Sequence, residues 1–520
     1  MKMTLTKRTL AALAATTMMT MPALAQVSIT VNATQVFGTV DPAKINDYTE
    51  YMGAVNLYDG LTTLDTDGAI VPQLADSWEV SDDNLTYTFT LKDGATFQDG
   101  SPVEASDVVY SVKRLLALNE GPSYLFTGLV DPEAIEAVDA RTVKIGLTKV
   151  FAPFITTTPL LLVLNEEAVK AASDEEWAED AVGEASFGAG PYGLASWNRG
   201  SELVMERYDE YHAGWDKGTP IDTIRFVITN DEATVKALAS SGELAFSASA
   251  HANETFETIG ALDGYRVEEI PTATGFYIKM NTKVAPTDDV HVRRAIQYAT
   301  DYDTIQSVIY PGAPMNGPLA PAFADAYNED LPAPEYNLEK AAEELAKSKY
   351  AGEDLTISHT YVAGLSFEED IALLMQANLE AIGITLDLKP EPWNRITELA
   401  GAPETTPATT QVFNGPSYPS PDSVFYVQYH SDSAGTWASM EWQQDPEIDG
   451  LIDASRATTD VAEQNVIYKE IQAKLHESAS DVYMLVQQKR HAMSECLQGY
   501  GFKPMMSWDY DFSTMYWTCE

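Results

Sequence analysis

The chain has 520 residues, of which 45% are hydrophobic and 21% charged, so its composition is that of a globular protein long enough for two or more lobes. Its 78 acidic residues outnumber 32 basic ones, which gives a net charge of −46. This charge excludes nucleic-acid binding, because neutralising phosphates requires clustered Lys and Arg. Two interpretations of the acidity stay open: a preference for cationic ligands, or a solubilising coat suited to salty surroundings.

The first 25 residues are typical of a secretory signal peptide. Three cations precede an apolar stretch that begins at Leu10, and Ala23-Leu24-Ala25 has the pattern of a cleavage site. This stretch is far shorter than the roughly 20 residues that span a bilayer. The residue directly after the cleavage site is Gln26 rather than a cysteine, so a lipid anchor is not expected. We predict that residues 1–25 are removed and that the product is free in a periplasm.

Patterns typical of strands and helices alternate along the rest of the chain. In residues 85–91, LTYTFTL, apolar side chains alternate with threonines. Strands are predicted at residues 27–31, 85–91, 221–228, 276–280, 355–361, 384–388 and 482–486. Helices are predicted at about residues 108–116, 231–240, 292–302, 338–348, 368–382 and 461–477. A proline-rich connection covers 311–334 and a polar loop 402–410. The pattern indicates a mixed α/β fold in more than one lobe.

GAGPYG, at residues 188–193, fits the glycine fingerprint of dinucleotide-binding enzymes. That fingerprint requires a helix after the glycines, whose N–H groups hold the pyrophosphate. Here the pattern that follows is strand, turn and strand, and Pro191 removes one N–H donor. The match is therefore a coincidence, and no nicotinamide or flavin cofactor is predicted.

Other signatures of catalysis or metal binding are absent from the sequence. There is no GxSxG, HExxH or Walker motif, and the seven histidines contain no i, i+4 pair. The start of a calcium loop at 65–68 lacks its closing Glu and is interpreted as a turn. We predict no metal, no cofactor and no enzymatic activity, although a secreted hydrolase on a borrowed scaffold stays an alternative.

Cys496 and Cys519 are the two cysteines of the chain. In an oxidising compartment a pair of this kind is expected to form one disulfide. A metal or redox pair is the alternative, but CxxC spacing and clustered histidines are missing. We predict a structural disulfide.

Aromatic residues are numerous, with 26 Tyr, 9 Trp and 17 Phe. Several lie in polar or proline-rich segments, among them Trp393, Tyr418, Trp437 and Trp442. Rings with a polar tip suit a cleft that closes on an amphiphilic ligand. The alternative for each is an ordinary core or surface position.

Residues 74–116, LADSWEVSDDNLTYTFTLKDGATFQDGSPVEASDVVYSVKRLL, closely resemble the dipeptide/oligopeptide/nickel class of extracytoplasmic solute-binding proteins of ABC importers, solute-binding protein family 5. The blocks at 41–61, 188–214, 288–305 and 445–477 agree with the same family in the same order. The resemblance therefore covers essentially the whole chain after residue 25.

This resemblance implies a two-lobed periplasmic-binding-protein fold of type II, cluster C-like, with a hinge between the lobes. Lobe I is expected at 27–273 and 487–520, with an extra subdomain at about 60–185. Lobe II is expected at 280–483. The chain crosses between the lobes near 271–277 and near 485–488.

The resemblance also implies a function. A small peptide or peptide-like solute is captured between the lobes and passed to the transmembrane permease of an ABC importer, whose separate ATPase subunits supply energy. The protein is expected to be a monomer without catalytic residues. Alternatives are an opine, polyamine, nickel chelate or sugar as solute, or a sensor that presents its ligand to a membrane receptor.

Candidate ligand-binding residues follow from position and from this resemblance. Peptide-binding relatives resemble W-x-x-D before a DPD turn, and aligning on Pro421-Asp422 places Asn414 and Ser417 at the tryptophan and the carboxylate. A serine lacks the charge that an ammonium group favours, so Asp422 is a candidate substitute. The complete set of predicted ligand-binding residues is Tyr51 in an N-terminal loop of lobe I, Tyr361 at a strand end, Trp393 after a Pro-Glu-Pro turn, Asn414, Ser417, Tyr418 and Asp422.

Overall fold

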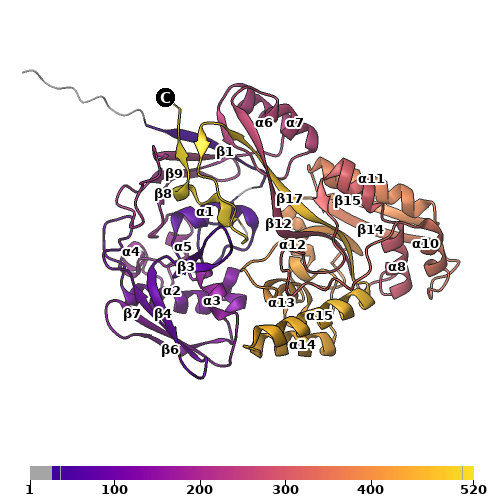
Figure 1. The fold of residues 1–520 in the computed structure, drawn as a ribbon, viewed down its shortest axis with the longest axis horizontal. Coiled ribbons are helices and arrows are strands. Elements are labelled where there is room, and N and C mark those ends of the chain that lie inside the picture. The colour runs from indigo at the N-terminus through magenta and orange to yellow at the C-terminus, as the bar shows by residue number, and fades with distance from the viewer. Residues whose placement is uncertain (1–25, 36, 506, 520) are drawn as a thin grey trace, which may run out of the picture.

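The computed structural model describes residues 26–35, 37–505 and 507–519. The fold is mixed α/β, as expected, and has two halves with a sheet that runs through both (Figure 1). The predicted signal peptide at 1–25 lies outside the described residues. Within the described part of the chain, no helix is both long enough and apolar enough to cross a membrane.

The main sheet has eleven strands and mixes parallel with antiparallel pairs. Along its path the strands are β15 (Ile384–Glu391), β14 (Leu355–Val362), β16 (Thr409–Asn414), β12 (Tyr265–Met280), β17 (Asp481–Ser494), β11 (Leu244–Phe246), β1 (Ser28–Ala33), β10 (Thr223–Ile228), β9 (Glu202–Arg207) and β8 (Tyr192–Asn198), and β13 (Gly312–Ala313) pairs with β17 off this path. Strands from both halves of the molecule therefore belong to one sheet, in which β12 and β17 make the connection between the halves.

Helices cover both halves of this sheet. They are α1 (Tyr48–Leu57), α2 (Ala105–Leu118), α3 (Phe154–Thr157), α4 (Glu166–Ala172), α5 (Glu179–Val182), α6 (Glu232–Ser240), α7 (Asn253–Gly260), α8 (Val290–Ala299), α9 (Tyr302–Thr304), α10 (Leu338–Leu345), α11 (Ser366–Glu380), α12 (Trp393–Leu399), α13 (Asp422–Tyr429), α14 (Pro446–Ala457) and α15 (Val461–Ser478). Each helix and strand predicted from periodicity corresponds to an observed element, but the strands predicted at 276–280 and 482–486 are only parts of the much longer β12 (Tyr265–Met280) and β17 (Asp481–Ser494). Two local predictions are wrong: Tyr51 lies in α1 rather than in a loop, and the polar loop ends where β16 begins at Thr409.

The long strands β12 and β17 are antiparallel and carry the chain from one half to the other (Figure 1). Their register pairs Tyr265 with Ser494 at one end and Lys279 with Asp481 at the other. It is interrupted between Pro271 and Gly275, where the chain was expected to cross between the lobes. Proline cannot donate a ladder hydrogen bond, so a break in pairing at this position has a local cause.

Two large apolar cores lie on the two sides of this interruption. One contains residues from Ile29 to Phe246 and from Met493 to Met515, and the other contains residues from Phe276 to Leu485. Tyr418 is the exception, because it follows β16 in sequence but packs with the first core. Separate cores are what two rigid lobes require. The lobe boundaries themselves stay a prediction.

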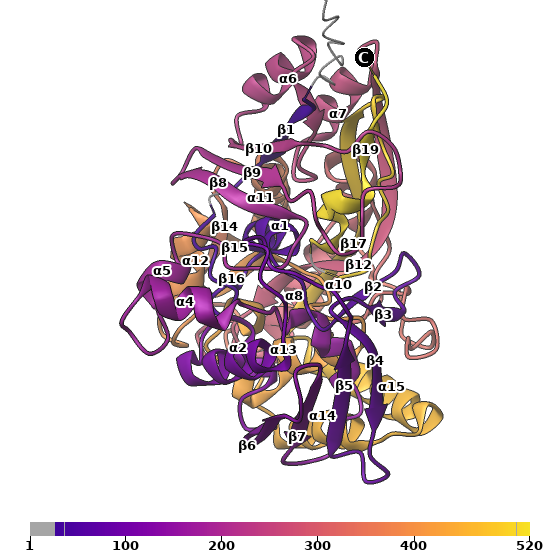
Figure 2. The same cartoon turned by 90° about the vertical axis from the view of Figure 1, so that its left-hand side faces the viewer.

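The expected extra subdomain contains a four-stranded antiparallel sheet of β4 (Ala75–Val80), β5 (Thr86–Leu91), β7 (Thr142–Leu147) and β6 (Val130–Ala137), beside the hairpin β2 (Thr62–Leu64) and β3 (Ile70–Pro72). Figures 1 and 2 both place it beside α14. A buried ion pair anchors α2, in which Arg114 donates to both carboxylate oxygens of Asp41 at 2.6 Å. Such a bidentate pair fixes orientation as well as charge.

The GAGPYG segment has a packing role. It leads into β8, and a turn then leads to β9, as predicted. A Cβ on Gly188 would lie 2.1 Å from the carbonyl oxygen of Leu57, and one on Gly190 would lie 2.5 Å from that of Asn56. Both glycines are thus required by the close approach of this segment to the end of α1.

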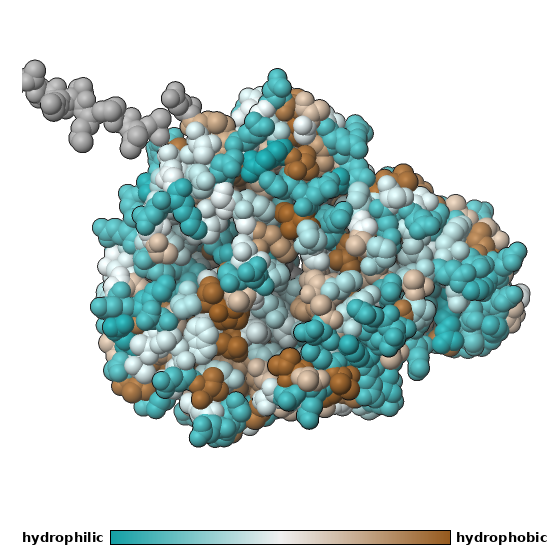
Figure 3. All heavy atoms as spheres, in the orientation of Figure 1, coloured by the Kyte–Doolittle hydropathy of each residue, from teal (hydrophilic) through white to brown (hydrophobic). Residues whose placement is uncertain are grey.

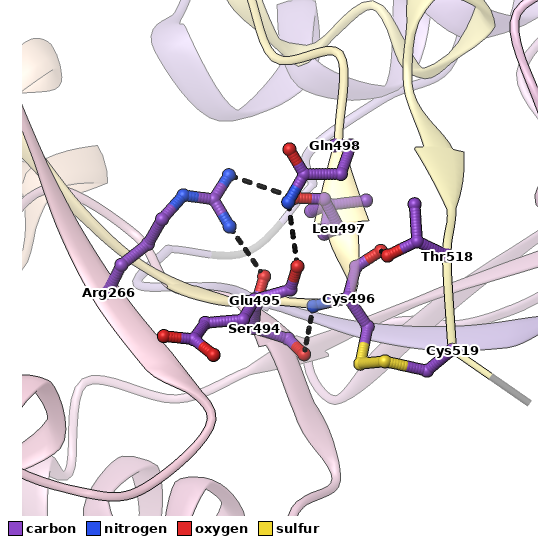
Figure 4. The surroundings of a disulfide bond; sticks show 8 residues. All are labelled: Arg266, Ser494, Glu495, Cys496, Leu497, Gln498, Thr518 and Cys519. Carbon is purple, nitrogen blue, oxygen red and sulfur yellow. Dashed lines mark hydrogen bonds between the residues drawn. A yellow bond between two sulfur atoms is a disulfide. The ribbon is translucent and has the colours of Figure 1, made fainter.

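Cys496 and Cys519 form the predicted disulfide, with their Cα atoms 5.2 Å apart (Figure 4). It joins the ends of a segment in which β18 (Leu497–Gln498) pairs with β19 (Tyr516–Trp517). Arg266 of β12 donates to the carbonyl oxygens of Ser494 and Leu497, both at 2.8 Å. The C-terminal segment is therefore fastened both to itself and to the long strand β12.

We expect the double variant C496S/C519S to unfold more easily than the wild type. The cysteines are 23 positions apart, and opening a loop of this size costs roughly 3 kcal/mol because the unfolded chain gains freedom. Urea unfolding followed by tryptophan fluorescence measures the change. Wild-type protein treated with a reductant is the matched control and should unfold like the variant. Equal midpoints for the variant and the oxidised wild type would contradict a stabilising role.

Candidate functional site

A cavity of about 170 Å³ lies between the two lobes, at the interruption of the β12–β17 ladder. Lobe I and the crossing strands provide Thr34, Gln35, Asp47, Tyr48, Ser249, Ala250, Thr272, Ala273, Thr274, Gln487, Lys489, Phe502, Pro504, Met505 and Ser507. Lobe II provides Val362, Leu365, Glu368, Trp393, Gln411, Val412, Phe413, Gly415, Pro416 and Trp437. Its walls are mostly apolar and aromatic with a few polar groups, which is the usual character of a small-molecule site.

On lobe I, the start of helix α1 presents Asp47 and Tyr48 to the cavity. Asp47 is the N-cap residue, and its carboxylate accepts hydrogen bonds from the backbone N–H groups of Thr49 at 2.8 Å and Glu50 at 3.1 Å. Capping by an aspartate is favourable because these N–H groups have no partner within the helix. Burial raises the pKa of Asp47 above its usual value.

Glu50, one turn into α1, makes this end of the helix more acidic. Burial, together with the nearby charge of Asp47, raises the pKa of Glu50 to about 8. Its carboxylate accepts a hydrogen bond from the N–H of Asn46 at 2.8 Å. The start of α1 thus carries two acidic groups that already have backbone partners, of which Asp47 lines the cavity.

The C-terminal segment closed by the disulfide forms a second part of the lobe I wall. Lys489 of β17 donates to the two carboxylate oxygens of Asp509 at 2.8 and 2.7 Å, and both side chains are almost fully buried. Burial opposes the charge of each, but their mutual attraction raises the pKa of Lys489 and holds that of Asp509 well below its usual range. An ammonium group has three N–H donors, so one of Lys489 is not used by Asp509.

On lobe II, an aromatic wall faces these groups. Trp393 begins helix α12, and its ring packs edge-on against Trp437 with the ring centroids 5.3 Å apart. Phe413 of β16 stacks on Phe276 at 4.0 Å. Large rings of this kind bury ligand surface while losing little conformational freedom.

Glu368 is the acidic side chain of the lobe II wall. It lies in the first turn of α11 and is 2% exposed. Its carboxylate accepts a hydrogen bond from the N–H of Val362 at 2.7 Å. Burial raises the pKa of Glu368 to about 8.

The structure brings one of the predicted ligand-binding residues into the cavity wall. Trp393 lines the cavity, and its contact with a ligand stays a prediction. Tyr361 and Asn414 are buried neighbours of the lining residues Val362 and Phe413 and do not line it themselves.

Four other predicted residues lie elsewhere. Tyr51 packs against Trp508 within lobe I, with ring centroids 5.6 Å apart, and Ser417 lies beside Tyr124. Tyr418 and Asp422 are fully buried, and the Tyr418 hydroxyl donates to Asp422 at 2.5 Å. These two side chains are bonded to each other and are not among the residues that line this cavity, so their contact with a ligand stays a prediction.

Sequence reasoning missed most of the wall, although two positions carried a signal. Asp47 precedes a helix and has Glu50 three residues later, a pattern typical of helix N-termini. Glu368 shares the inward face of α11 with Ile371 and Met375, so it is an acid on an apolar stripe. Nothing comparable marks the C-terminal wall residues.

One rim of the cleft is closed by Arg456 of α14. Its guanidinium lies over Tyr426 at 3.6 Å and over Phe151 of the extra subdomain at 4.6 Å, measured to the ring centroids. Its carbonyl oxygen accepts a hydrogen bond from the N–H of Ala152 at 2.9 Å. Burial raises the pKa of Asp422, whose carboxylate lies 3.8 Å from Arg456. Tyr418 and Asp422 therefore support a contact between the lobes.

Contacts also join the lobes on the other side. The Ser366 hydroxyl lies 3.5 Å from the carboxylate of Glu232, and the Asn253 amide donates to the carbonyl oxygen of Val308 at 3.4 Å. These bonds are long and exposed, so they hold the lobes together only weakly. With both rims in contact, the structure is a closed form. Hydrophilic residues cover most of the face seen in Figure 3.

Two lobes, a crossing pair of strands and a cavity between them define a two-lobed binding protein. Comparison with known proteins gives the family. The model of the bacterial extracellular solute-binding proteins, family 5, matches residues 69–436. The chain belongs to this family.

Similar proteins cover nearly the full length of the chain. The probable D,D-dipeptide-binding periplasmic protein DdpA of Escherichia coli K12 is 27% identical over 92% of both chains. The glutathione-binding protein GsiB of Salmonella paratyphi A is 28% identical over 98% of both. The periplasmic binding protein DppA of Helicobacter pylori, solved with the peptide STSA, has a TM-score of 0.85 at 21% identity and covers 94% of this chain and 98% of its own. The last comparison confirms the fold.

We expect R456A to open the cleft. The variant removes the cation that bridges Phe151 and Tyr426, a type of contact that contributes about 0.5–2 kcal/mol, so binding of a ligand that requires the closed form should weaken by roughly 2- to 30-fold. Small-angle scattering without ligand should show a larger radius of gyration. R395A, which removes an exposed arginine of α12, is the control and should leave the radius unchanged. The same radius for R456A and wild type would contradict a closing role.

We expect K489M to destabilise the protein by about 3–5 kcal/mol at pH 7, because it leaves the buried carboxylate of Asp509 without its cation. The folded-state pKa of Asp509 is depressed in the wild type, so this pair stabilises above about pH 4 and is lost below it. In K489M the deficit should shrink between pH 7 and pH 5, since protonation removes the unpaired charge.

Urea unfolding at both pH values measures this effect. The control is K349M, which breaks an exposed pair with Asp288 and should cost at most about 1 kcal/mol at either pH. Equal costs for the two variants would show that burial of the Lys489–Asp509 pair has no influence on its contribution.

Proposed function

We propose that this protein is the substrate-binding component of an ABC importer and captures a small peptide or peptide-like solute. The observation that carries the proposal is the cavity between the lobes, which combines aromatic walls with one cationic and two acidic groups. Lys489 has an unused N–H donor for a carboxylate, and Asp47 and Glu368 are acceptors for N–H groups. A zwitterion with an apolar body would place a carboxylate at Lys489, an amino group at one of the acidic side chains and its apolar part against the aromatic walls.

The family and its members support the same solute class. The names of DdpA and GsiB refer to D,D-dipeptides and glutathione, and the structure of DppA from Helicobacter pylori contains the peptide STSA. These ligands all contain peptide bonds.

Capture is a change of conformation without chemistry. Strands β12 and β17 lose register at Pro271–Gly275, so the two lobes can rotate about this point. A solute that contacts both walls binds the closed form better than the open form and shifts the population toward it. No step of this cycle requires a catalytic residue, and the solute is released unchanged.

The proposal places the protein in the periplasm after removal of residues 1–25. The closed, loaded form docks on the transmembrane subunits of a permease, and separate ATPase subunits provide the energy for transport.

Thermal unfolding tests the solute class. We expect Ser-Thr-Ser-Ala, D-Ala-D-Ala or glutathione to raise the melting temperature of the wild type, because a ligand that binds only the folded form stabilises it by about 2.7 kcal/mol at one hundred times its dissociation constant. Mass spectrometry of the recovered ligand should show an unchanged mass. Stabilisation by sugars or nickel alone would contradict a peptide-like solute, and a changed mass would contradict transport without chemistry.

A further inference from the structure

Buried acidic side chains in the described part of the chain have charged or ionisable partners in most cases. Asp41 pairs with Arg114, and Asp509 with Lys489. The remaining pairs of this kind are Asp59 with His212, Asp422 with Arg456, and Glu441 and Asp481 with Lys279. A buried carboxylate without such a partner is costly, so its retention indicates a role.

Glu368 is an exception that faces the cavity. No ion pair joins it to a cation among the residues the structure describes, and one backbone N–H, that of Val362, is its hydrogen-bond donor. The cavity wall therefore contains a carboxyl group that is 2% exposed and has capacity for further donors.

A second acceptor lies next to it. Gln411 of β16 is fully buried and also lines the cavity. Its side-chain N–H group donates to the carbonyl oxygen of Glu368 and to His359, both at 2.9 Å, which fixes the amide in place. Its Oε1 atom has no hydrogen-bond partner. The lobe II wall thus includes two residues with unused acceptor capacity, Glu368 at its carboxyl group and Gln411 at its Oε1 atom.

We infer that Glu368, supported by Gln411, is the lobe II anchor for a protonated amino group of the ligand. The inference deepens the proposed function and rests on it in one respect, because it assigns a position to the amino end of a peptide-like solute. An ammonium group would be the cationic partner that Glu368 does not have within the described part of the chain. It would also provide N–H donors for the Glu368 carboxyl group and for the Gln411 Oε1 atom.

Asp47, on the opposite wall, is less suited to this role. Its carboxylate already accepts two backbone hydrogen bonds as the cap of α1. Glu50, the other acid of this helix end, does not line the cavity. Anchoring the amino group on lobe II leaves Lys489, on the lobe I side, for a ligand carboxylate, so one solute bridges both lobes.

Titration supports this assignment. With the pKa of Glu368 raised to about 8, most of the carboxyl is neutral at pH 7 before an ammonium group arrives. The ionisable groups nearest to it are Tyr310, whose pKa is raised to about 12, Tyr361, whose pKa is raised, and, through Gln411, His359, whose pKa is lowered to about 3. Arg490 faces Tyr310 and stays charged. None of these changes protonation near neutral pH, so an ammonium that ionises Glu368 should release a proton.

The test compares E368Q with the wild type by isothermal titration calorimetry. The probes are Ser-Thr-Ser-Ala, D-Ala-D-Ala, glutathione and spermidine, and the three peptides are also used with their amino groups acetylated. E368Q should bind the unblocked peptides roughly 10- to 150-fold more weakly, because a hydrogen bond to a charged group contributes about 1.5–3 kcal/mol. Acetylated peptides should bind the wild type roughly 10- to 150-fold more weakly than the unblocked peptides do, because they lack the ammonium group.

E369Q is the matched control, since Glu369 is the next residue of α11 and is exposed. It should bind every probe like the wild type. Titrations of the wild type in buffers of different ionisation enthalpy should show proton release on binding, and E368Q should not. If E368Q fails to fold, acetylation and proton release in the wild type decide the question by themselves.

The outcomes separate this inference from the proposed function. Peptides that bind wild type and E368Q equally would overturn the anchor and leave the peptide-binding function intact. Binding of spermidine alone, weakened in E368Q, would support the anchor and overturn the peptide-like solute. If no amine-bearing probe binds the wild type, both are overturned.

Discussion

The antiparallel pairing of β12 and β17 is the interaction on which the rest of the structure depends. These two strands are the connection between the halves of the main sheet, and their ladder is interrupted between Pro271 and Gly275. Thr272, Thr274 and Gln487, at that interruption, line the cavity. The place where the backbone can bend is therefore also a wall of the binding site, so a ligand that fills the site acts directly on the hinge.

The C-terminal segment adds a constraint that the hinge alone does not provide. The disulfide between Cys496 and Cys519 encloses the segment that supplies Phe502, Met505 and Asp509. The disulfide adds to the β18–β19 pairing and to the hydrogen bonds of Asn56 with Tyr510 and Phe512, which also hold this segment in place. Covalent closure limits the conformations available to this part of the lobe I wall. Less conformational entropy of the protein is then lost when a ligand binds.

Much of the fold could be predicted from the sequence, but little of the site could. Strands such as residues 85–91 and helices such as 461–477 carry their own periodicity, so local pattern was sufficient. The alignment on Pro421-Asp422 predicts Tyr418 in the ligand loop, and Asp422 is predicted there as a substitute for the carboxylate that Ser417 lacks. Their burial depends on Arg456 and on a core of the other lobe, and no local pattern contains that information.

The same limit explains why Glu368 was overlooked among 78 acidic residues. Counting charges does not distinguish a solvated carboxylate from a buried one, and the 32 basic residues are too few to pair with most acids. Only the structure shows that Asp41 and Asp509 have cations as partners, whereas no cation in the described part of the chain pairs with Glu368. In a protein so rich in negative charge, the informative acid is the one that burial has removed from solvent without a partner, because a ligand can then supply what the chain does not.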